Sequence, residues 1–252
     1  MATVNDILEF FEEFAPVSTA MEFDNVGLLV GDKNRFVRRA LVSLDITPEV
    51  VYEAEKLECE LIISHHPVIF QPLKRLEAGS APYLLAKKGI SAICMHTNLD
   101  LSESFGVNLC LASAVGIKNV QRSDKGECLF VGELEREMNS DELAEQVKFA
   151  LDCKGLRYTA ANNRIKKVAV CSGSGGSEIF AAYEEGCAAL VTGEIKHHEI
   201  NTANDLGVTV IDAGHFKSEN VVIMPLVNKL GKRFSDIIFT KSKNYDDNIK
   251  FC

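Results

Sequence analysis

The sequence lacks the long apolar runs and the basic start that direct a chain into or across a membrane. No apolar stretch approaches the roughly 20 residues of a membrane-spanning helix. The segment 1–14 carries acidic residues but no Lys or Arg, whereas a secretory signal has a basic front and a continuous apolar core. We therefore expect a cytoplasmic protein with no membrane partner.

Basic residues are too few for a protein that binds nucleic acid in general. The chain has 27 Lys and Arg against 36 Asp and Glu, which gives a net charge of -9 and a pI of about 5.2. Binding along a long phosphate backbone needs a basic face. No long nucleic acid is expected as a partner, although a local basic pocket is compatible with this charge.

The cysteines lack the C-x-x-C spacing of a zinc or redox site. Most of them lie in apolar stretches, as Cys94 and Cys171 do, and free cysteine is often buried. With 252 residues, the chain can bury a large core without disulfides. We interpret the cysteines as buried thiols of a protein in a reducing compartment.

The apolar pattern predicts an α/β fold in which short strands alternate with helices. Strands are expected over 26–31, 40–45, 61–63, 91–95, 128–132, 167–171, 188–192 and 208–211. Helices are expected over 4–14, 48–58, 82–88, 106–116, 140–151, 177–185, 199–206 and 218–230. The stretch 124–165 breaks the pattern, so we divide the chain into an N-terminal region (residues 1–123), a central segment of the second lobe (residues 124–165) and a C-terminal region (residues 166–252).

The pattern before residue 65 returns after residue 166. Val42 and Val170, Cys59 and Cys187, and Ile63 and Val191 are each 128 positions apart. An internal repeat of this kind predicts two similar α/β lobes that face each other across a cleft, although any two strand–helix–strand units share some resemblance.

The six histidines all follow predicted strands: His65, His66, His96, His197, His198 and His215. Ligands of open α/β sheets bind at the carboxyl ends of the strands, so these side chains are expected to share one site. Each histidine taken alone could instead be a hydrogen-bonded structural residue.

Several of these histidines combine with carboxylates into a metal-binding pattern. Adjacent His65 and His66 point in different directions from an extended backbone, which suits two neighbouring ions better than one. His215 and Glu219 are spaced i and i+4 at a helix start, and Asp100 ends another strand. Three histidines and two carboxylates fit two ions of Zn, Mn, Fe or Ni, and ions so paired activate a shared water for hydrolysis.

Other residues at the same strand ends are predicted to bind the substrate or to act in acid–base catalysis. Ser172, Gly173, Gly175 and Gly176 follow a strand and open a helix, where backbone N–H groups can hold phosphate; a plain strand-to-helix turn is the alternative. Glu194, His197 and His198 are candidates for acid–base catalysis, or else form a polar loop with a helix cap. His96 is predicted to act in catalysis from behind the metal ligands.

Motifs along the chain resemble one known family. In order they are Phe23-Asp24-Asn25-Val26-Gly27-Leu28, Ser64-His65-His66-Pro67, His96-Thr97-Asn98-Leu99-Asp100, Thr192-Gly193-Glu194-Ile195-Lys196-His197-His198 and Asp212-Ala213-Gly214-His215-Phe216-Lys217-Ser218-Glu219. Together they resemble the Nif-three-like family, often described as GTP cyclohydrolase 1 type 2 homologues. Phe23 stands where that motif usually has Trp, and the chain has no Trp.

The resemblance implies a Nif-three-like fold of two α/β lobes around a di-metal cleft, assembled as a toroidal homohexamer. It implies the same ligands, His65, His66, Asp100, His215 and Glu219. Longer members carry a domain inserted between the lobes, for which 124–165 leaves no room. We expect a di-metal hydrolase of a nucleotide-like or other phosphate-bearing small molecule. The alternative is a metal-binding regulatory or ligand-binding ring without turnover.

Overall fold

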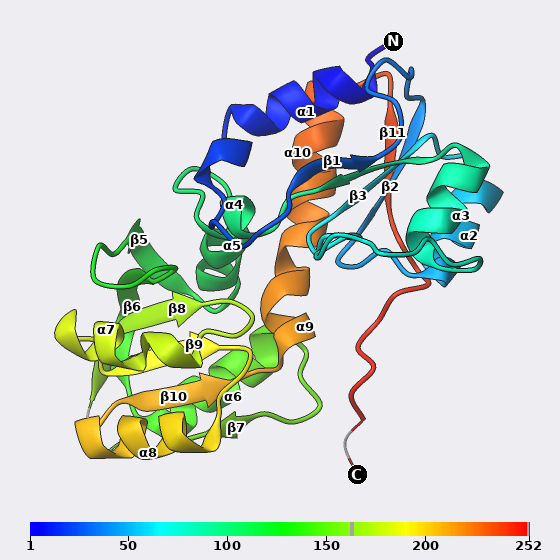
Figure 1. Ribbon diagram of the computed structural model, residues 1–252. Helices are drawn as coiled ribbons and strands as arrows, with labels where there is room; N and C mark the ends of the chain where they lie inside the picture. Colours follow the sequence, from blue (N-terminus) through cyan, green and yellow to red (C-terminus); the bar gives the residue numbers. More distant parts are fainter. Residues whose placement is uncertain (162–163, 251) are drawn as a thin grey trace. The chain divides into compact units, whose positions relative to one another are not determined.

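The computed structural model describes residues 1–161, 164–250 and 252, and the chain divides into two compact units. Unit 1 comprises Met1–Ser102 and Ile223–Asp246, and unit 2 comprises Glu103–Val222 and Asp247–Cys252 (Figure 1). Among the described residues, no helix combines the length and the apolar character needed to cross a bilayer.

Unit 1 is built on a five-stranded sheet with the order β1-β4-β3-β2-β11. All strands are parallel except β1, which runs antiparallel to β4. Its elements are α1 (Val4–Glu12), η1 (Val17–Thr19), β1 (Gly27–Val30), β2 (Arg39–Ser43), α2 (Pro48–Lys56), β3 (Leu61–Ser64), α3 (Ala81–Lys88), β4 (Ser91–Cys94), α4 (Thr97–Asp100), α10 (Ile223–Arg233) and β11 (Ile238–Lys241).

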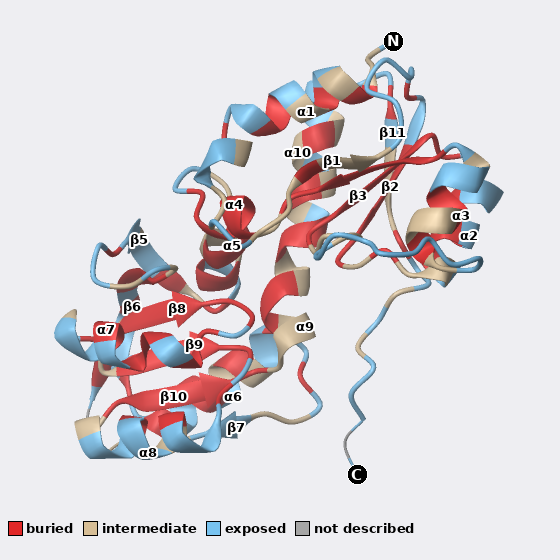
Figure 2. Cartoon of the chain, in the orientation of Figure 1, coloured by how far each residue is buried: buried red, intermediate tan, exposed pale blue. Residues whose placement is uncertain are grey.

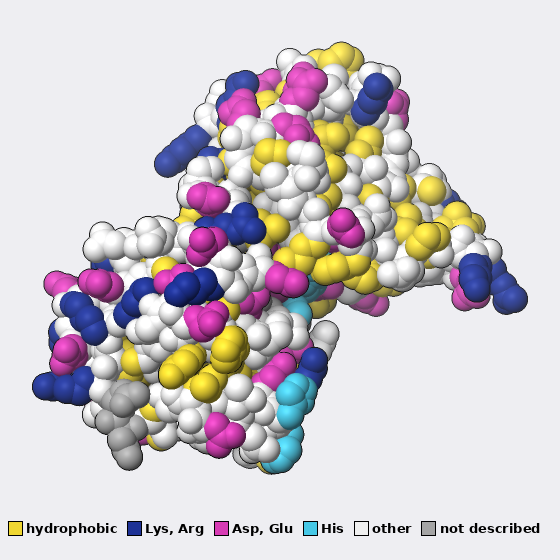
Figure 3. Space-filling model, turned by 60° about the vertical axis from the view of Figure 1, so that its left-hand side comes forward, with side chains coloured by type: hydrophobic (Ala, Val, Ile, Leu, Met, Phe, Trp, Pro, Cys, Tyr) yellow, Lys and Arg dark blue, Asp and Glu magenta, His cyan; other side chains and the backbone are white. Residues whose placement is uncertain are grey.

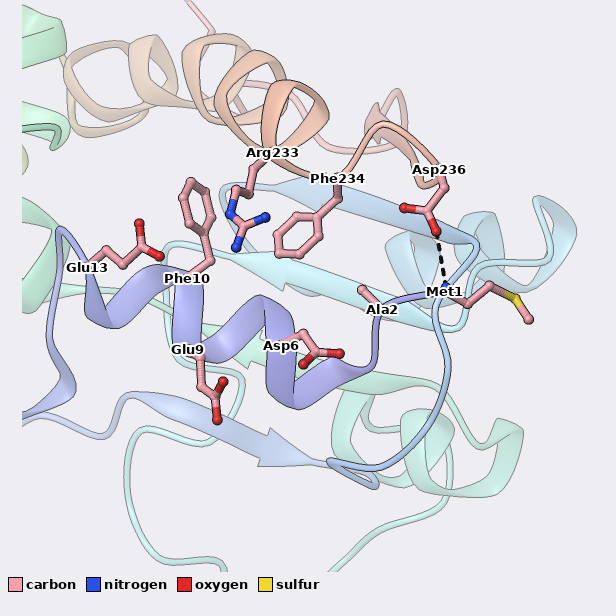
Figure 4. A pocket seen from close by; sticks show the side chains of 9 residues that line it. All are labelled: Met1, Ala2, Asp6, Glu9, Phe10, Glu13, Arg233, Phe234 and Asp236. Carbon is pink, nitrogen blue, oxygen red and sulfur yellow. Dashed lines mark ion pairs between the residues drawn. The ribbon is translucent and has the colours of Figure 1, made fainter.

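Helices cover both faces of this sheet. Val50, Val51 and Leu85 of α2 and α3 pack with the buried strand residues Leu41 and Ile62 on one face. On the other side, α10 lies against β11 and β2, and α1 packs against the end of α10. Figure 4 shows that second contact, where the rings of Phe10 and Phe234 meet edge to face at 5.7 Å.

Unit 2 is built on a six-stranded sheet with the order β5-β6-β8-β9-β10-β7, whose centre, β8-β9-β10, is parallel. The outer strands pair antiparallel. Its elements are α5 (Val107–Ala114), β5 (Ile117–Arg122), β6 (Phe130–Met138), α6 (Ser140–Ala150), β7 (Arg157–Tyr158), β8 (Ile165–Cys171), η2 (Gly176–Glu178), α7 (Ile179–Glu184), β9 (Ala189–Thr192), α8 (His197–Leu206), β10 (Thr209–Asp212), α9 (His215–Glu219) and η3 (Asn220–Val222).

Alternate residues of the central strands of unit 2 face two separate cores. Val168 and Val170 of β8 pack with α5 and α6, whereas Ala169 and Cys171 pack with α7 and α8. Burial on both faces explains the near-continuous apolar runs of these strands. Figure 2 shows the resulting band of buried residues in β8, β9 and β10. The predicted α/β class is confirmed.

The parallel strands of the two sheets share one register. Ala40 pairs with Leu61 in β2 and β3, and Val168 pairs with Ala189 in β8 and β9, which are the positions 128 residues further on. The match continues through four successive pairs. The offset predicted from the sequence therefore relates structurally equivalent strands. The connection from β3 to β4 uses residues 65–90, whereas the one from β9 to β10 uses only 193–208, ten fewer.

The boundaries of the units differ from the predicted division at 123 and 165. The segment 103–123, which holds α5 and β5, belongs to unit 2, and the segment 223–246 belongs to unit 1. The second difference arises because β11 pairs in parallel with β2, so the end of the chain completes the sheet formed by its beginning.

Candidate metal centre

Two candidate metal ligands of unit 1 follow β3 directly. After Ser64, the backbone turns so that the Ser64 hydroxyl donates to the carbonyl of His66 at 2.8 Å, and His66 N donates to the carbonyl of Leu44 at 2.9 Å. His65 is buried, whereas His66 is half-buried. The two rings have centroids 5.0 Å apart. The turn thus presents two imidazoles side by side at the carboxyl edge of the sheet.

The neighbouring strand β4 brings His96 and Asp100 to the same edge. One ring nitrogen of each of His65, His66 and His96 lies within 4.8 Å of the others, which is close enough for a shared metal ion. No helix was expected between residues 88 and 106, but Thr97–Asp100 forms the short helix α4. That turn buries Asp100 and places its Oδ1 3.6 Å from Nε2 of His65.

Asp24 holds this arrangement together, although sequence reasoning gave it no role at the site. Its carboxylate accepts hydrogen bonds from Nδ1 of His96 at 2.9 Å and from the amide and hydroxyl of Thr97 at 3.0 and 2.5 Å. Burial disfavours the charge on Asp24, but these hydrogen bonds outweigh it and hold the pKa of the carboxyl well below its usual range. The Asp-Asn-Val-Gly motif therefore supports His96.

Unit 2 presents a second group of donors in α9. Nε2 of His215 lies 3.2 Å from Oε2 of Glu219 one helical turn later, as the i and i+4 spacing predicted. Glu219 is buried, and His215 is half-buried. On the other side of the ring, Nδ1 of His215 lies 3.1 Å from Oε1 of Glu194. Glu194 was predicted as an acid–base residue, and the structure places it as the partner that orients His215.

Four histidines share one hydrogen-bonding pattern: Nδ1 meets an acceptor, so Nε2 is the nitrogen that can coordinate an ion. The acceptors are the Met95 carbonyl for His65 at 2.8 Å, Asp45 for His66 at 3.0 Å, Asp24 for His96 and Glu194 for His215. Such a partner fixes the tautomer with the proton on Nδ1, which is how metal-binding histidines are usually held. Imidazole nitrogens with carboxylate oxygens suit a divalent transition metal. The donor groups therefore fit the implied ions.

Glycine at two positions makes room for the donors of unit 2. A Cβ at Gly173 would lie 2.2 Å from Oε1 of Glu219, and Gly173 also has a φ of +61°. A Cβ at Gly193 would lie 2.4 Å from the Ser218 hydroxyl and 2.8 Å from the Cα of His215. At Gly193 the added atom would meet backbone, so α9 can lie this close to the end of β9 only because a side chain is missing there, whereas at Gly173 it would displace the Glu219 carboxylate.

The variant Gly173→Ala is expected to weaken metal binding by about tenfold or more. Its Cβ must displace the Glu219 carboxylate, and we take the cost from the loss of residues that hold a ligand in position, which is about 10–100-fold in affinity. The measurement is metal affinity by competition with a chelator. Gly186→Ala is the matched control, because Gly186 also has a positive φ, of +73°, but nothing lies within 4 Å of the added Cβ.

Backbone strain alone would destabilise both variants by about 1–2 kcal/mol. Equal metal affinities in the two variants, with equal losses of stability, would show that Gly173 is needed only for its backbone conformation.

The loop 172–176, which contains Gly173, was predicted to hold a phosphate, but three of its backbone amides donate to other groups of the protein. Ser172 N donates to Oδ1 of Asn108 at 2.7 Å, and Gly173 N donates to the Ser218 hydroxyl at 3.0 Å. Gly175 N donates to the Thr192 hydroxyl at 3.0 Å. A Cβ at Gly176 would clash with the Glu199 carboxylate. These contacts favour the alternative interpretation, a packed strand-to-helix turn that supports α9.

His197 and His198 lie in the first turn of α8, which begins two residues before the predicted start. Both are exposed, and Nε2 of His198 lies 4.0 Å from Oε1 of Glu199. Among the residues that the structure describes, neither belongs to a group of side chains that could hold a metal ion. The prediction that they act beside the candidate ligands therefore gains no support from the geometry of unit 2.

A cavity elsewhere in unit 1 holds none of the predicted site residues. It has a volume of about 420 Å³ and lies between α1 and the end of α10, where Asp6, Glu9 and Arg233 line it (Figure 4). Over the face shown in Figure 3, acidic and basic side chains are interspersed. That face therefore offers no continuous basic track for a phosphate backbone.

Fold and donor groups together define an α/β protein with histidine and carboxylate clusters suited to divalent metal ions. The model of the Duf34/NIF3 family (NGG1p interacting factor 3) matches residues 2–247, and the chain belongs to this family. The resemblance inferred from the motifs is confirmed.

Curated and solved relatives agree with this assignment. The chain is 34% identical to a GTP cyclohydrolase 1 type 2 homolog of Clostridium perfringens over 98% of this chain and 99% of the relative. It is 34% identical to the GTP cyclohydrolase 1 type 2 of Helicobacter pylori over 87% of this chain and 88% of that relative. A hypothetical protein of Staphylococcus aureus superposes with a TM-score of 0.93 at 30% identity over 99% of both chains. A Bacillus cereus protein related to NIF3 superposes with a TM-score of 0.92 at 25% sequence identity, over 100% of this chain and 99% of that protein.

Proposed function

We propose that this protein is a divalent-metal-dependent hydrolase of a nucleotide-like or other phosphate-bearing small molecule. His65, His66 and Asp100 of unit 1 and His215 and Glu219 of unit 2 would hold the ions. The observation that carries the proposal is the shared orientation of the histidines, each with Nδ1 on an acceptor. Nε2 of His65 and Nε2 of His215 each lie next to a carboxylate, as metal-binding imidazoles do, whereas a purely structural histidine does not require that arrangement.

Two ions are proposed because five ligands exceed what one tetrahedral ion requires. The donors are nitrogen and oxygen, which is compatible with Zn, Mn, Fe or Ni. When bound, such ions act as Lewis acids and lower the pKa of a coordinated water to about 7.

The supporting residues keep the donors ready for this chemistry. Asp45 and Glu194 fix the rings of His66 and His215, and Asp24 fixes His96. His96 is not among the five proposed ligands, so its Nε2 would serve proton transfer instead of coordination: with the other proton on Nδ1, it would take up a proton and return it to a leaving group. We therefore keep His96 as the proposed acid–base residue, held by Asp24 as a histidine is held in a catalytic dyad.

The substrate class comes from the relatives. The Helicobacter pylori relative is named GTP cyclohydrolase 1 type 2, and GTP is a nucleotide that carries phosphates. We extend only this class to the present chain. The net charge of -9 favours a small substrate over a long nucleic acid.

A substrate panel tests the proposal. Nucleotides, cyclic nucleotides and phosphorylated metabolites would be assayed with protein loaded with Mn, Zn, Ni or Fe. We expect turnover of at least one compound, its loss on chelation and its return on reloading. If fully loaded protein binds a compound at the ions but turns over nothing in the panel, the metal-dependent ligand-binding ring should replace the hydrolase.

A further inference from the structure

We propose that Phe23 and Phe70 of unit 1 form a stacking platform for the planar aromatic heterocycle of the substrate. The inference deepens the proposed function and rests on it. It specifies the part of the small molecule that the ions do not bind, namely a nucleobase or a similar fused ring.

The two rings lie beside the histidine cluster. Phe23 and Phe70 have ring centroids 6.2 Å apart with planes tilted by 53°, and the Phe70 ring meets His96 edge to face at 6.2 Å. His96 in turn lies 5.1 Å from His65 and 5.5 Å from His66, measured between ring centroids. The row of rings therefore leads from the solvent directly to the candidate ligands.

Both phenylalanines are exposed, at 59% for Phe23 and 43% for Phe70. Because their planes are tilted by 53°, the two rings do not cover each other face to face, and the exposed part of each ring can contact a third aromatic group. Apolar side chains stabilise a fold when they are buried. The exposed rings of Phe23 and Phe70, which lie beside the histidines and Asp24, therefore contribute little to folding. A flat, partly polar ligand suits such a surface, since its π face covers the rings while its edges meet polar groups.

Hydrogen bonds from neighbouring side chains fix the two segments that carry these phenylalanines. Asn25 donates from Nδ2 to the carbonyl of Ile69 at 2.5 Å, which ties the segment before Phe70 to the segment after Phe23. Asp24, between them, binds His96 and Thr97. Phe70 also lies in the longer β3–β4 connection, and the corresponding connection in unit 2 is ten residues shorter. The longer connection of unit 1 thus places an aromatic ring beside its histidines.

A tryptophan at position 23 provides a direct probe. The chain has no Trp, so Phe23→Trp would be the single indole, and stacking of a heterocycle on it quenches its fluorescence. We expect quenching of the metal-loaded variant by GTP or by a pterin, but not by ribose 5-phosphate or inorganic triphosphate. Phe36→Trp is the matched control, because Phe36 is 58% exposed in the same unit and should show no quenching.

Phe70→Ala tests the second ring without a label. We expect its affinity for GTP to fall about 5- to 100-fold, the usual effect of losing one stacking partner, with unchanged affinity for inorganic triphosphate. Phe36→Ala should bind both probes as the parent protein does.

The outcomes separate this inference from the proposed function. Quenching at position 23 without turnover would leave the platform standing and reject the hydrolase. Turnover of a substrate by the parent protein, with no quenching by GTP or pterin and no effect of Phe70→Ala, would overturn the platform. A change in oligomeric state of Phe70→Ala by light scattering, with unchanged nucleotide binding, would overturn it too and assign the rings to contacts between copies.

Discussion

Asp100→Ala is expected to lower kcat/KM of the metal-loaded protein by about a thousandfold or more, which corresponds to roughly 4 kcal/mol in the activation barrier. Asp100 is buried, and its Oδ1 lies 3.6 Å from Nε2 of His65, so the two donors face one point. Its removal takes away the carboxylate that lies beside Nε2 of His65. An ion held there would lose an anionic ligand and with it some of its affinity and its fixed position.

The assay compares Asp100→Ala with His198→Ala, since the His198 side chain is 75% exposed and belongs to neither donor group. Both variants would be measured at saturating metal, so that loss of activity is separated from loss of the ion. Thermal unfolding monitors the fold. Full activity of Asp100→Ala would remove Asp100 from the catalytic centre, and an equal loss in His198→Ala would show that the effect is not specific to the ligand.

Residue spacing predicted the parallel strands and the donors at their ends. Short apolar runs such as Leu61–Ser64 and Ala189–Thr192 are buried on both faces, so their hydrophobicity marks them in the sequence. Because the residues that follow parallel strands lie at the same edge of the sheet, the sequence alone predicts that His65, His66 and His215 lie at such an edge. The i and i+4 pair of His215 and Glu219 needed only the geometry of one helical turn.

Elements at the margins of the sheets were missed for a physical reason. β5 and β11 are partly exposed, and β7 has only two residues, so none carries a distinct apolar pattern. The pairing of β11 with β2 joins the end of the chain to its beginning, and local periodicity contains no information about such distant contacts. The predicted domain boundaries therefore differ from the units of the structure.

Two residues that orient the histidines, Asp45 and Asp24, were given no role at the site from the sequence. Asp45 ended a predicted strand and could have been suspected on that ground, since it lies at the same edge as His66. Asp24 lies 72 positions from His96, and only the folded chain brings them together. The hypothesis of a phosphate-binding loop gained no support, for a related reason: the sequence contains the loop but does not show what its amides bind. The sequence shows Gly173 and Gly175, but not that Ser218 and Thr192 accept their N–H groups.

Three variants in unit 2 should differ in metal affinity in a graded order. Glu219→Ala is expected to lose more than about 100-fold, because it removes a ligand and not merely a residue that supports one. Glu194→Ala should lose about 10- to 100-fold, since it only frees the ring of His215 to rotate and change tautomer. His198→Ala should bind metal as the parent protein does. Chelator competition gives the affinities, and elemental analysis gives the number of ions, for which we expect two per chain.

The ranking of the three metal affinities is more informative than any one of them. It distinguishes an ion coordinated by Glu219 from an ion attracted loosely to acidic side chains on the surface. Glu194 is 55% exposed and Glu219 only 5%, so an ion attracted loosely to surface charge would depend more on Glu194. A coordinated ion depends more on the buried carboxylate, whose oxygen already lies 3.2 Å from Nε2 of His215. If Glu194→Ala loses as much affinity as Glu219→Ala, Glu194 is itself a ligand. If neither variant loses any, His215 and Glu219 form a structural pair, and the metal centre must be sought among His65, His66, His96 and Asp100 alone.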